Sequence, residues 1–145
     1  MKNSLIVRLL KNGGFTLLEL LIVMIIIGLL AALIGPKMVG RVGESRQTVA
    51  KQQIEGFSSA LEMYKLDTTR YPSQEVGLEA LVTQPQGVTN WKGPYLTKRI
   101  IPKDPWGNEY VYIYPGQHGD YDIISYGADG KPGGESEDKD ITSWE

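Results

Sequence analysis

The sequence predicts an α+β fold in which a long N-terminal helix packs on a small antiparallel β-sheet. Apolar residues recur at spacings near three, four and seven over residues 37–66, with charged and amide side chains between them, as in an amphipathic helix. Residues 109–114 and 121–126 alternate as half-buried strands do, and the segment 115–120 between them is typical of a turn. A helix followed by such a hairpin favours an α+β head on a helical stalk.

Between the helix and the hairpin, the sequence predicts a capped helix and then an irregular loop. Ser73 is a good N-cap for a short helix that runs through Val82. Prolines and glycines are interleaved over residues 84–108, so we expect no regular structure there. Four apolar side chains should hold this loop against the long helix: Trp91, Tyr95, Ile100 and Trp106.

An apolar segment precedes the amphipathic helix. Residues 15–35 are apolar apart from one threonine and Glu19, and as a helix they are long enough to cross a hydrocarbon core of roughly 30 Å. Residues 1–14 carry three basic side chains and no acid, which places the N-terminus in the cytoplasm. We therefore expect residues 15–36 to span the membrane and residues 37–145 to lie beyond it; in a Gram-negative bacterium that compartment is the periplasm.

The junction between the basic stretch and the apolar segment has more than one interpretation. The apolar run is longer than the roughly 7–15 residues of an ordinary signal peptide, and no A-x-A cleavage site follows it. An uncleaved signal anchor is compatible with both facts. A cut between Gly14 and Phe15 is the other interpretation, because the flexible pair Gly13-Gly14 offers an extended protease site. The residues alone leave both open.

Glu19 requires an electrostatic explanation if its segment lies in a membrane. An ionised carboxylate there costs several kcal/mol unless it is paired. Its side chain can reach the cytoplasmic headgroups, because Glu19 lies near the start of the span. Alternatively, a cut after Gly14 creates a positive α-amino group on Phe15, one helical turn away, in the same or a neighbouring chain. A pairing with a neighbour would set the register of assembly, a known use of buried ion pairs.

Composition and motifs argue against an enzyme. The formal net charge of −2 does not suggest nucleic-acid binding, and the absence of cysteine excludes thiolate chemistry and disulfides. There is no P-loop, Rossmann glycine pattern or H-E-x-x-H motif. The single histidine, His118, lies near Asp120 and Ser125, so a Ser-His-Asp hydrolase is possible in principle, but the G-x-S-x-G elbow is missing.

The acidic end of the chain is a candidate cation site. Residues 129–140 crowd carboxylates into a glycine-rich loop, and calcium takes six to eight oxygens from carboxylates and carbonyls. The spacing is not that of an EF-hand. A solvated, disordered acidic tail is the alternative, although Ile141 and Trp144 are apolar anchors that would draw this end back onto the fold.

The start of the chain resembles the class III signal of type IV pilins and their relatives. The resemblance rests on the run from Gly14 to Glu19, Gly-Phe-Thr-Leu-Leu-Glu, followed by an apolar stretch. It implies a pilin-like fold, cleavage by a prepilin peptidase between Gly14 and Phe15, N-methylation of Phe15, and a role for Glu19 in subunit docking. Pro36 matches the helix-bending proline of that superfamily and, with its neighbouring glycine, marks a place where the helix can bend.

Almost the whole chain, residues 13–144, resembles the major pseudopilins of type II secretion systems. The resemblance rests on the following motifs: Tyr71-Pro72, Gly77-Leu78-Glu79-Ala80-Leu81, Gly93-Pro94-Tyr95, Pro102-Lys103-Asp104-Pro105-Trp106-Gly107-Asn108, Pro115-Gly116-Gln117-His118-Gly119-Asp120-Tyr121-Asp122 and Gly127-Ala128-Asp129-Gly130. It implies a homo-oligomeric helical filament, held at the bacterial inner membrane by single-pass helices, with heads in the periplasm. Its partners would be minor pseudopilins, an inner-membrane secretion platform and the prepilin peptidase, and its task the export of folded proteins across the outer membrane.

The same resemblance implies a calcium ion (Ca2+) in the C-terminal loop. The implied ligands are the Asp129 carboxylate, the Tyr126 carbonyl, a Ser136 carbonyl and the side chains of Asp138 and Asp140. The alternative within the superfamily is a type IV pilin of a surface pilus. Such pilins commonly close their C-terminal loop with a disulfide, so the lack of cysteine favours the pseudopilin.

Overall fold

The computed structural model describes residues 14–145, except for the side chains of residues 34–41. The predicted leader, residues 1–14, therefore lies outside the described residues apart from Gly14. The chain divides into two units, Met1–Val39 and Gly40–Glu145, which we call the first and the second unit. One helix, α1 (Leu17–Thr68), contributes residues to both units.

Helix α1 begins with a side-chain cap. The Thr16 hydroxyl accepts a hydrogen bond from the backbone N–H of Glu19 at 3.1 Å, which satisfies one of the free donors of the first turn. The helical backbone continues through Pro36, whose side chain is outside the described residues, and ends at Thr68. Thr69 then adopts a positive φ of 68°. The amphipathic helix predicted over residues 37–66 is confirmed.

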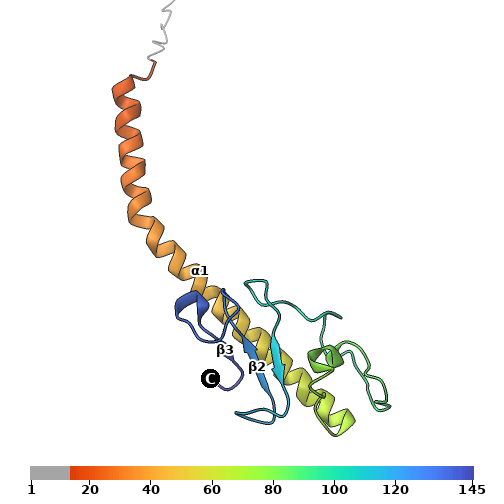
Figure 1. The fold of residues 1–145 in the computed structure, drawn as a ribbon. Coiled ribbons are helices and arrows are strands. Elements are labelled where there is room, and N and C mark those ends of the chain that lie inside the picture. Colours follow the sequence, from red (N-terminus) through yellow and green to blue (C-terminus); the bar gives the residue numbers. More distant parts are fainter. Residues whose placement is uncertain (1–13) are drawn as a thin grey trace, which may run out of the picture. The chain divides into compact units, whose positions relative to one another are not determined.

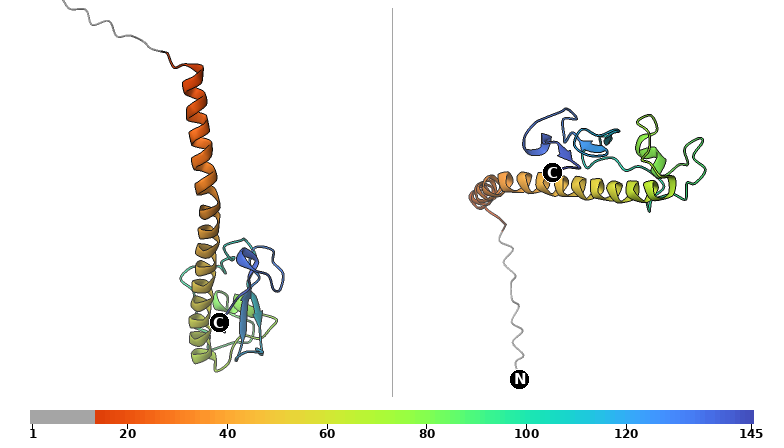
Figure 2. Two further views of the ribbon diagram at one scale, coloured as in Figure 1. Left: turned by 90° about the vertical axis from the view of Figure 1, so that its left-hand side faces the viewer. Right: turned by 90° about the horizontal axis from the view of Figure 1, so that it is seen from below.

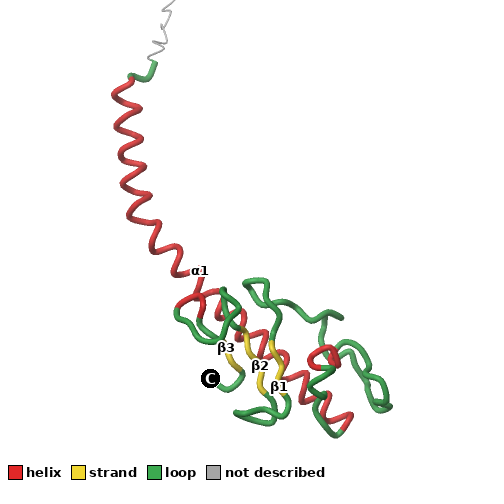
Figure 3. The backbone as a smooth tube through the Cα atoms, viewed as in Figure 1, coloured by secondary structure: helices red, strands yellow, loops and turns green. Residues whose placement is uncertain are grey.

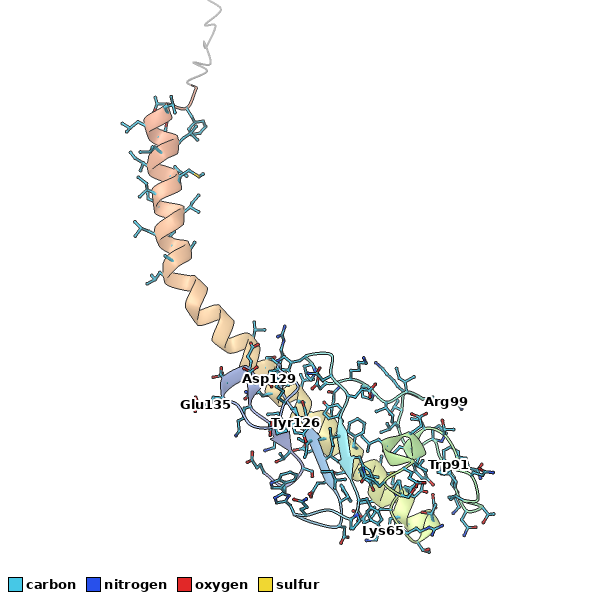
Figure 4. All side chains as sticks on the ribbon, viewed as in Figure 1. Lys65, Trp91, Arg99, Tyr126, Asp129 and Glu135 are labelled. Atoms are coloured by element: carbon cyan, nitrogen blue, oxygen red, sulfur yellow. The ribbon has the colours of Figure 1, made fainter. Side chains whose placement is uncertain are left out.

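In the first unit, all the large apolar side chains from Phe15 to Leu33 are exposed. Their exposed fractions run from 45% at Val23 to 88% at Leu17, and Figure 4 shows them projecting from all sides of the helix. Among the described residues, the structure contains no helix that is both long and apolar enough to cross a membrane. The membrane span over residues 15–36 stays a prediction.

The second unit contains a three-stranded antiparallel sheet beside the helix (Figures 1 and 3). Its strands are β1 (Val111–Ile113), β2 (Asp122–Ser125) and β3 (Ile141–Thr142), in that order. Facing pairs are Tyr112 with Ile123 and Ile124 with Thr142. The predicted hairpin is confirmed by β1 and β2, which are shorter than expected, whereas β3 was not predicted.

The core of the second unit lies between α1 and the sheet. Figure 2 shows the strands and loops gathered along one side of this part of the helix. Phe57 and Leu61 on α1 are 2% and 0% exposed, and the Phe57 ring meets the Tyr110 ring edge to face, with centroids 5.1 Å apart. Ile123 of β2 is fully buried in the same cluster. The predicted packing of a helix on a small antiparallel sheet is confirmed.

Two expectations for the segment between helix and sheet were wrong. The helix expected after Ser73 is only a short 3₁₀-helix, η1 (Gly77–Leu81), and its N-terminus has no side-chain cap. Ser73 acts through its backbone carbonyl, which accepts hydrogen bonds from the N–H groups of the next turn. Ile100 is 63% exposed and does not hold the loop, whereas the Trp91 indole N–H donates to the Ala80 carbonyl at 2.8 Å.

Candidate functional site

The residues at the predicted cleavage site are accessible. Gly14 and Phe15 precede helix α1, and Phe15 is 77% exposed. Glu19 lies in the first turn of the helix, where the unpaired backbone N–H groups create a partial positive charge that favours a carboxylate. The cap that the Thr16 hydroxyl forms on the Glu19 N–H was not predicted from the sequence, although a threonine followed three residues later by a glutamate is the usual signature of such a cap.

The acidic tail folds back onto the second unit. The backbone N–H of Ser143 donates to the Ile123 carbonyl at 3.0 Å, and the Ser143 hydroxyl accepts from the Ile123 N–H at 3.0 Å. The Trp144 ring stacks on His118 with centroids 3.8 Å apart, and Ile141 packs against the core. Both predicted apolar anchors therefore contact the fold.

Within the tail, two segments run close together because glycines allow it. Gly127 has a φ of +61°, and a β-carbon there would stand 2.7 Å from the Glu137 carbonyl oxygen. Gly134 has a φ of +106°, and a β-carbon there would stand 2.6 Å from the Asp138 carbonyl oxygen. The Ala128 N–H donates to the Glu137 carbonyl at 2.9 Å, so a hydrogen bond also joins these two segments, residues 126–130 and 134–140, which we call the two arms of the loop.

The predicted calcium ligands come from these two arms. Figure 4 shows Tyr126, Asp129 and Glu135 at one end of the second unit, away from Lys65 and Arg99. Three of the predicted ligands make hydrogen bonds in the structure. Asp129 Oδ1 accepts from the Lys131 N–H at 3.1 Å, and Asp140 Oδ2 accepts from the Gly133 N–H at 2.9 Å. The Ser136 carbonyl accepts from the Gln47 amide and from the Lys139 N–H, the latter at 3.3 Å. Asp138 lies in the short 3₁₀-helix η2 (Ser136–Asp138).

The arrangement fits a hard cation in one respect and limits it in another. Asp140 Oδ1 is buried and has no hydrogen-bond partner among the residues that the structure describes, which is costly for a carboxylate unless a cation or donor satisfies it. Among the described residues, no three histidine, cysteine, aspartate or glutamate side chains gather where they could hold a metal. A calcium ion bound by all three predicted carboxylates would therefore require these side chains to come closer together than they lie here, with backbone carbonyls supplying further oxygens.

A second loop, residues 104–108, supports the first arm of the tail. Asp104 is 4% exposed, and its Oδ2 atom accepts a hydrogen bond from the Ser125 hydroxyl at 2.6 Å. The Asn108 side-chain amide donates to the Gly127 carbonyl at 2.8 Å. Sequence reasoning did not find these two residues as part of the site. The signal available was the run Asp104-Pro-Trp-Gly-Asn108, in which aspartate, proline and glycine favour a tight turn.

The structure does not assemble the Ser-His-Asp group considered for a hydrolase. His118 Nδ1 lies 3.1 Å from Asp122, not Asp120, while the Ser125 hydroxyl is bound to Asp104.

Asp122 is 1% exposed, and this burial by itself would raise the pKa of its carboxyl. Hydrogen bonds from the Gln117 and His118 N–H groups and the His118 ring outweigh burial and hold that pKa below its usual range.

Two family models match the sequence in complementary segments. Residues 9–35 match the prokaryotic N-terminal methylation motif, which includes the predicted cleavage site and Glu19. Residues 37–144 match protein G of the type II secretion system, which includes the sheet, the 104–108 loop and the acidic tail. Both family resemblances of the sequence are therefore matched by a family model over the corresponding segment.

Individual proteins give the same result. Type II secretion system core protein G of Pseudomonas aeruginosa is 48% identical over 139 residues, which cover 93% of this chain and 96% of that protein. The corresponding protein of Vibrio cholerae is 44% identical over 136 residues, covering 92% of each. A crystal structure of the major pseudopilin from the type 2 secretion system of enterohaemorrhagic Escherichia coli is 37% identical, with a TM-score of 0.63 over 72% of this chain and 87% of that one. The chain belongs to the type II secretion system protein G family, the major pseudopilins, and is a structural subunit rather than an enzyme.

Proposed function

We propose that the chain is made as a precursor and is cut by a prepilin peptidase between Gly14 and Phe15. The match to the methylation motif over residues 9–35 and the exposure of Phe15 support this step. Methylation then falls on the new α-amino group of Phe15. That group lies just before the Thr16 cap, within reach of the first helical turn that carries Glu19.

The apolar residues from Phe15 to Gly35 then hold the subunit in the inner membrane. Their number corresponds to a helix of about 30 Å, the thickness of a hydrocarbon core. The basic leader keeps the N-terminus in the cytoplasm, so the second unit lies in the periplasm. The observation that carries this proposal is the exposure of every large apolar side chain from Phe15 to Leu33, since so much apolar surface requires lipid or other subunits around it.

Copies of the chain then assemble through these helices into a helical pseudopilus. An exposed apolar helix can exchange lipid for neighbouring helices, and the α-amino group of Phe15 can neutralise Glu19 of the adjacent copy. Minor pseudopilins, an inner-membrane secretion platform and a separate ATPase would act with this filament to move folded proteins across the outer membrane. The type IV pilin of a surface pilus, the alternative considered from the sequence, is disfavoured by the match of residues 37–144 to protein G of the type II secretion system.

Calcium is the proposed cofactor of the acidic tail. Asp129, Asp138 and Asp140 would supply carboxylates, and Tyr126 and Ser136 backbone carbonyls. When bound, the cation supplies the positive charge that joins the two arms of the loop and neutralises their carboxylates. The buried, unpaired Asp140 Oδ1 supports this proposal.

The processing step is tested by N-terminal sequencing and intact-mass measurement of the chain extracted from membranes. We expect a mature chain that begins at methylated Phe15, and an unprocessed chain from a strain without the prepilin peptidase. A chain that begins at Met1 in both strains would instead establish the uncleaved signal anchor. Deleting the gene should abolish secretion of exoproteins without removing surface pili; the reverse result would favour the type IV pilin.

A further inference from the structure

The turn formed by residues 104–108 is closed by its own hydrogen bonds. The Asp104 N–H donates to the Asn108 carbonyl at 2.8 Å, and the Gly107 N–H donates back to the Asp104 carbonyl at 2.9 Å. Asp104 Oδ1 also accepts from the N–H groups of Trp106, at 3.1 Å, and Asn108, at 2.7 Å. With Ser125 bound to Oδ2, both oxygens of this buried carboxylate are satisfied, so the turn is a rigid support.

This support acts on one short stretch of backbone. The Asn108 amide binds the Gly127 carbonyl, and the Ser125 hydroxyl that binds Asp104 also accepts from the Gly127 N–H at 3.4 Å. The Asn108 side chain also lies beside Gly130, 3.6 Å from where a β-carbon would stand. The support therefore holds Gly127 through both of its backbone polar groups.

Gly127 lies between two of the proposed calcium ligands. Tyr126 precedes it directly, and Asp129 follows two residues later. On its other side Gly127 is in close contact with the backbone of Glu137 and Asp138, in the arm that would supply the remaining ligands. A shift of Gly127 would therefore change the spacing between the two arms.

We propose that Asn108 and Asp104 are positioning residues that fix the Gly127 backbone and so set the Tyr126 carbonyl and the Asp129 carboxylate for the cation. This inference rests on the proposed calcium function. The physical reason is that a loop already held in its bound geometry loses less conformational entropy when the ion binds. Neither residue needs to touch the ion.

The test is a calorimetric titration of the full-length chain, in detergent micelles, with Ca2+ alone. We expect Asn108→Ala to raise the calcium dissociation constant about tenfold or more, the usual effect of removing a partner that orients metal ligands. Tyr112→Phe is the matched control, because it removes the hydrogen bond from the Tyr112 hydroxyl to the Pro72 carbonyl, outside this network. The control should lower the melting temperature equally with and without calcium and leave the dissociation constant within about twofold.

A second variant separates position from charge and covers the case in which Asn108→Ala does not fold. Asn108→Asp has the same shape but cannot donate to the Gly127 carbonyl, and it adds a negative charge near the site. If charge alone mattered, this variant would bind calcium more tightly; we expect weaker binding. Wild-type-like or tighter binding by a folded variant overturns the inference. A wild-type chain that binds no calcium overturns the calcium proposal itself, and this inference with it.

Discussion

The two units use helix α1 in opposite ways. From Leu17 to Leu33 in the first unit, its large apolar side chains are exposed on every side, whereas in the second unit Phe57 and Leu61 are buried on one face against a sheet. This contrast shows which part of the helix buries its apolar side chains against its own chain. The second unit satisfies its apolar surface internally, while the first requires lipid or other subunits, so substitutions in the two units should affect different properties.

The largest effect is expected at Glu19, which lies in the first unit. A substitution there should affect filament assembly rather than folding stability. Glu19→Ala removes the proposed partner of the Phe15 α-amino group, and breaking such a pair in a low-dielectric site costs about 3–5 kcal/mol. We expect normal cleavage after Gly14 but about a hundredfold or greater loss of filaments, because each 1.4 kcal/mol corresponds to a factor of ten. Filaments are counted by electron microscopy and cleavage is read from intact mass. Filaments of normal number and length would contradict the role of Glu19 in register.

A pair of alanine variants tests the comparison directly. Phe57→Ala should lower the free energy of unfolding of the second unit by about 3–5 kcal/mol, because it leaves a cavity in the core. Leu29→Ala, at an exposed apolar position of the first unit, should change it by less than about 0.5 kcal/mol. Urea unfolding in micelles, followed by fluorescence of the three tryptophans, measures the second unit alone, since Trp91, Trp106 and Trp144 all lie in it. Similar losses of unfolding free energy for both variants would contradict the contrast drawn between the two units.

Calcium removal should give the next largest effect, confined to the second unit. At a calcium concentration one hundred times the dissociation constant, binding stabilises the folded state by about 2.7 kcal/mol. Chelation should therefore lower the melting temperature by about 10–20 °C, given roughly 4–8 °C per kcal/mol for a domain of this size. Asp129→Ala should reproduce this loss, whereas Asp120→Ala, which removes a surface carboxylate paired with Lys65, should keep the full calcium response. If chelation left the melting temperature unchanged, the acidic tail would not be a calcium site.

The smallest effect is expected from acid at Asp122. Because its folded-state pKa is below the unfolded value of about 3.9, its stabilisation is complete above that pH and is lost as the pH falls toward the folded-state pKa. Asp122→Asn should therefore flatten the loss of stability below about pH 5, while lowering stability at neutral pH. Urea unfolding of both chains between about pH 3 and pH 7 measures this. An unchanged acid slope would mean that other carboxyls control it.

Sequence reasoning found the features that repeat and missed those that depend on distant partners. The regular spacing of apolar residues along α1 is enough to predict that Phe57 and Leu61 share one apolar face, and both are buried. Strand β3 was missed because it has only two residues, Ile141 and Thr142, too few to show an alternation. Its pairing with β2 depends on the path of the whole tail between them.

Local rules failed where tertiary contacts decide the conformation. Ser73 has the side chain of an N-cap, yet only a short 3₁₀-helix without a side-chain cap follows it. A tertiary contact holds this segment: the Gln74 side-chain amide donates to the Tyr112 carbonyl at 2.8 Å. The link between Asp104 and Ser125 could not be inferred from spacing, because it joins residues that are 21 positions apart. The Thr16 cap, by contrast, was readable from the sequence and was overlooked.

The close passage of backbone at Gly127 and Gly134 bears on how relatives of this chain are aligned. A β-carbon at Gly127 would meet the backbone of Glu137 and Asp138 in the opposite arm, and one at Gly134 would meet the Asp138 backbone in its own arm, in both cases at less than 3 Å. Neither glycine can therefore be exchanged without moving the backbone near Asp138. Insertions and deletions between related tails are better accommodated in residues 128–133, which lie between the two fixed points. An alignment anchored on these two glycines, rather than on the acidic residues, would therefore assign equivalent carboxylates in tails of different length.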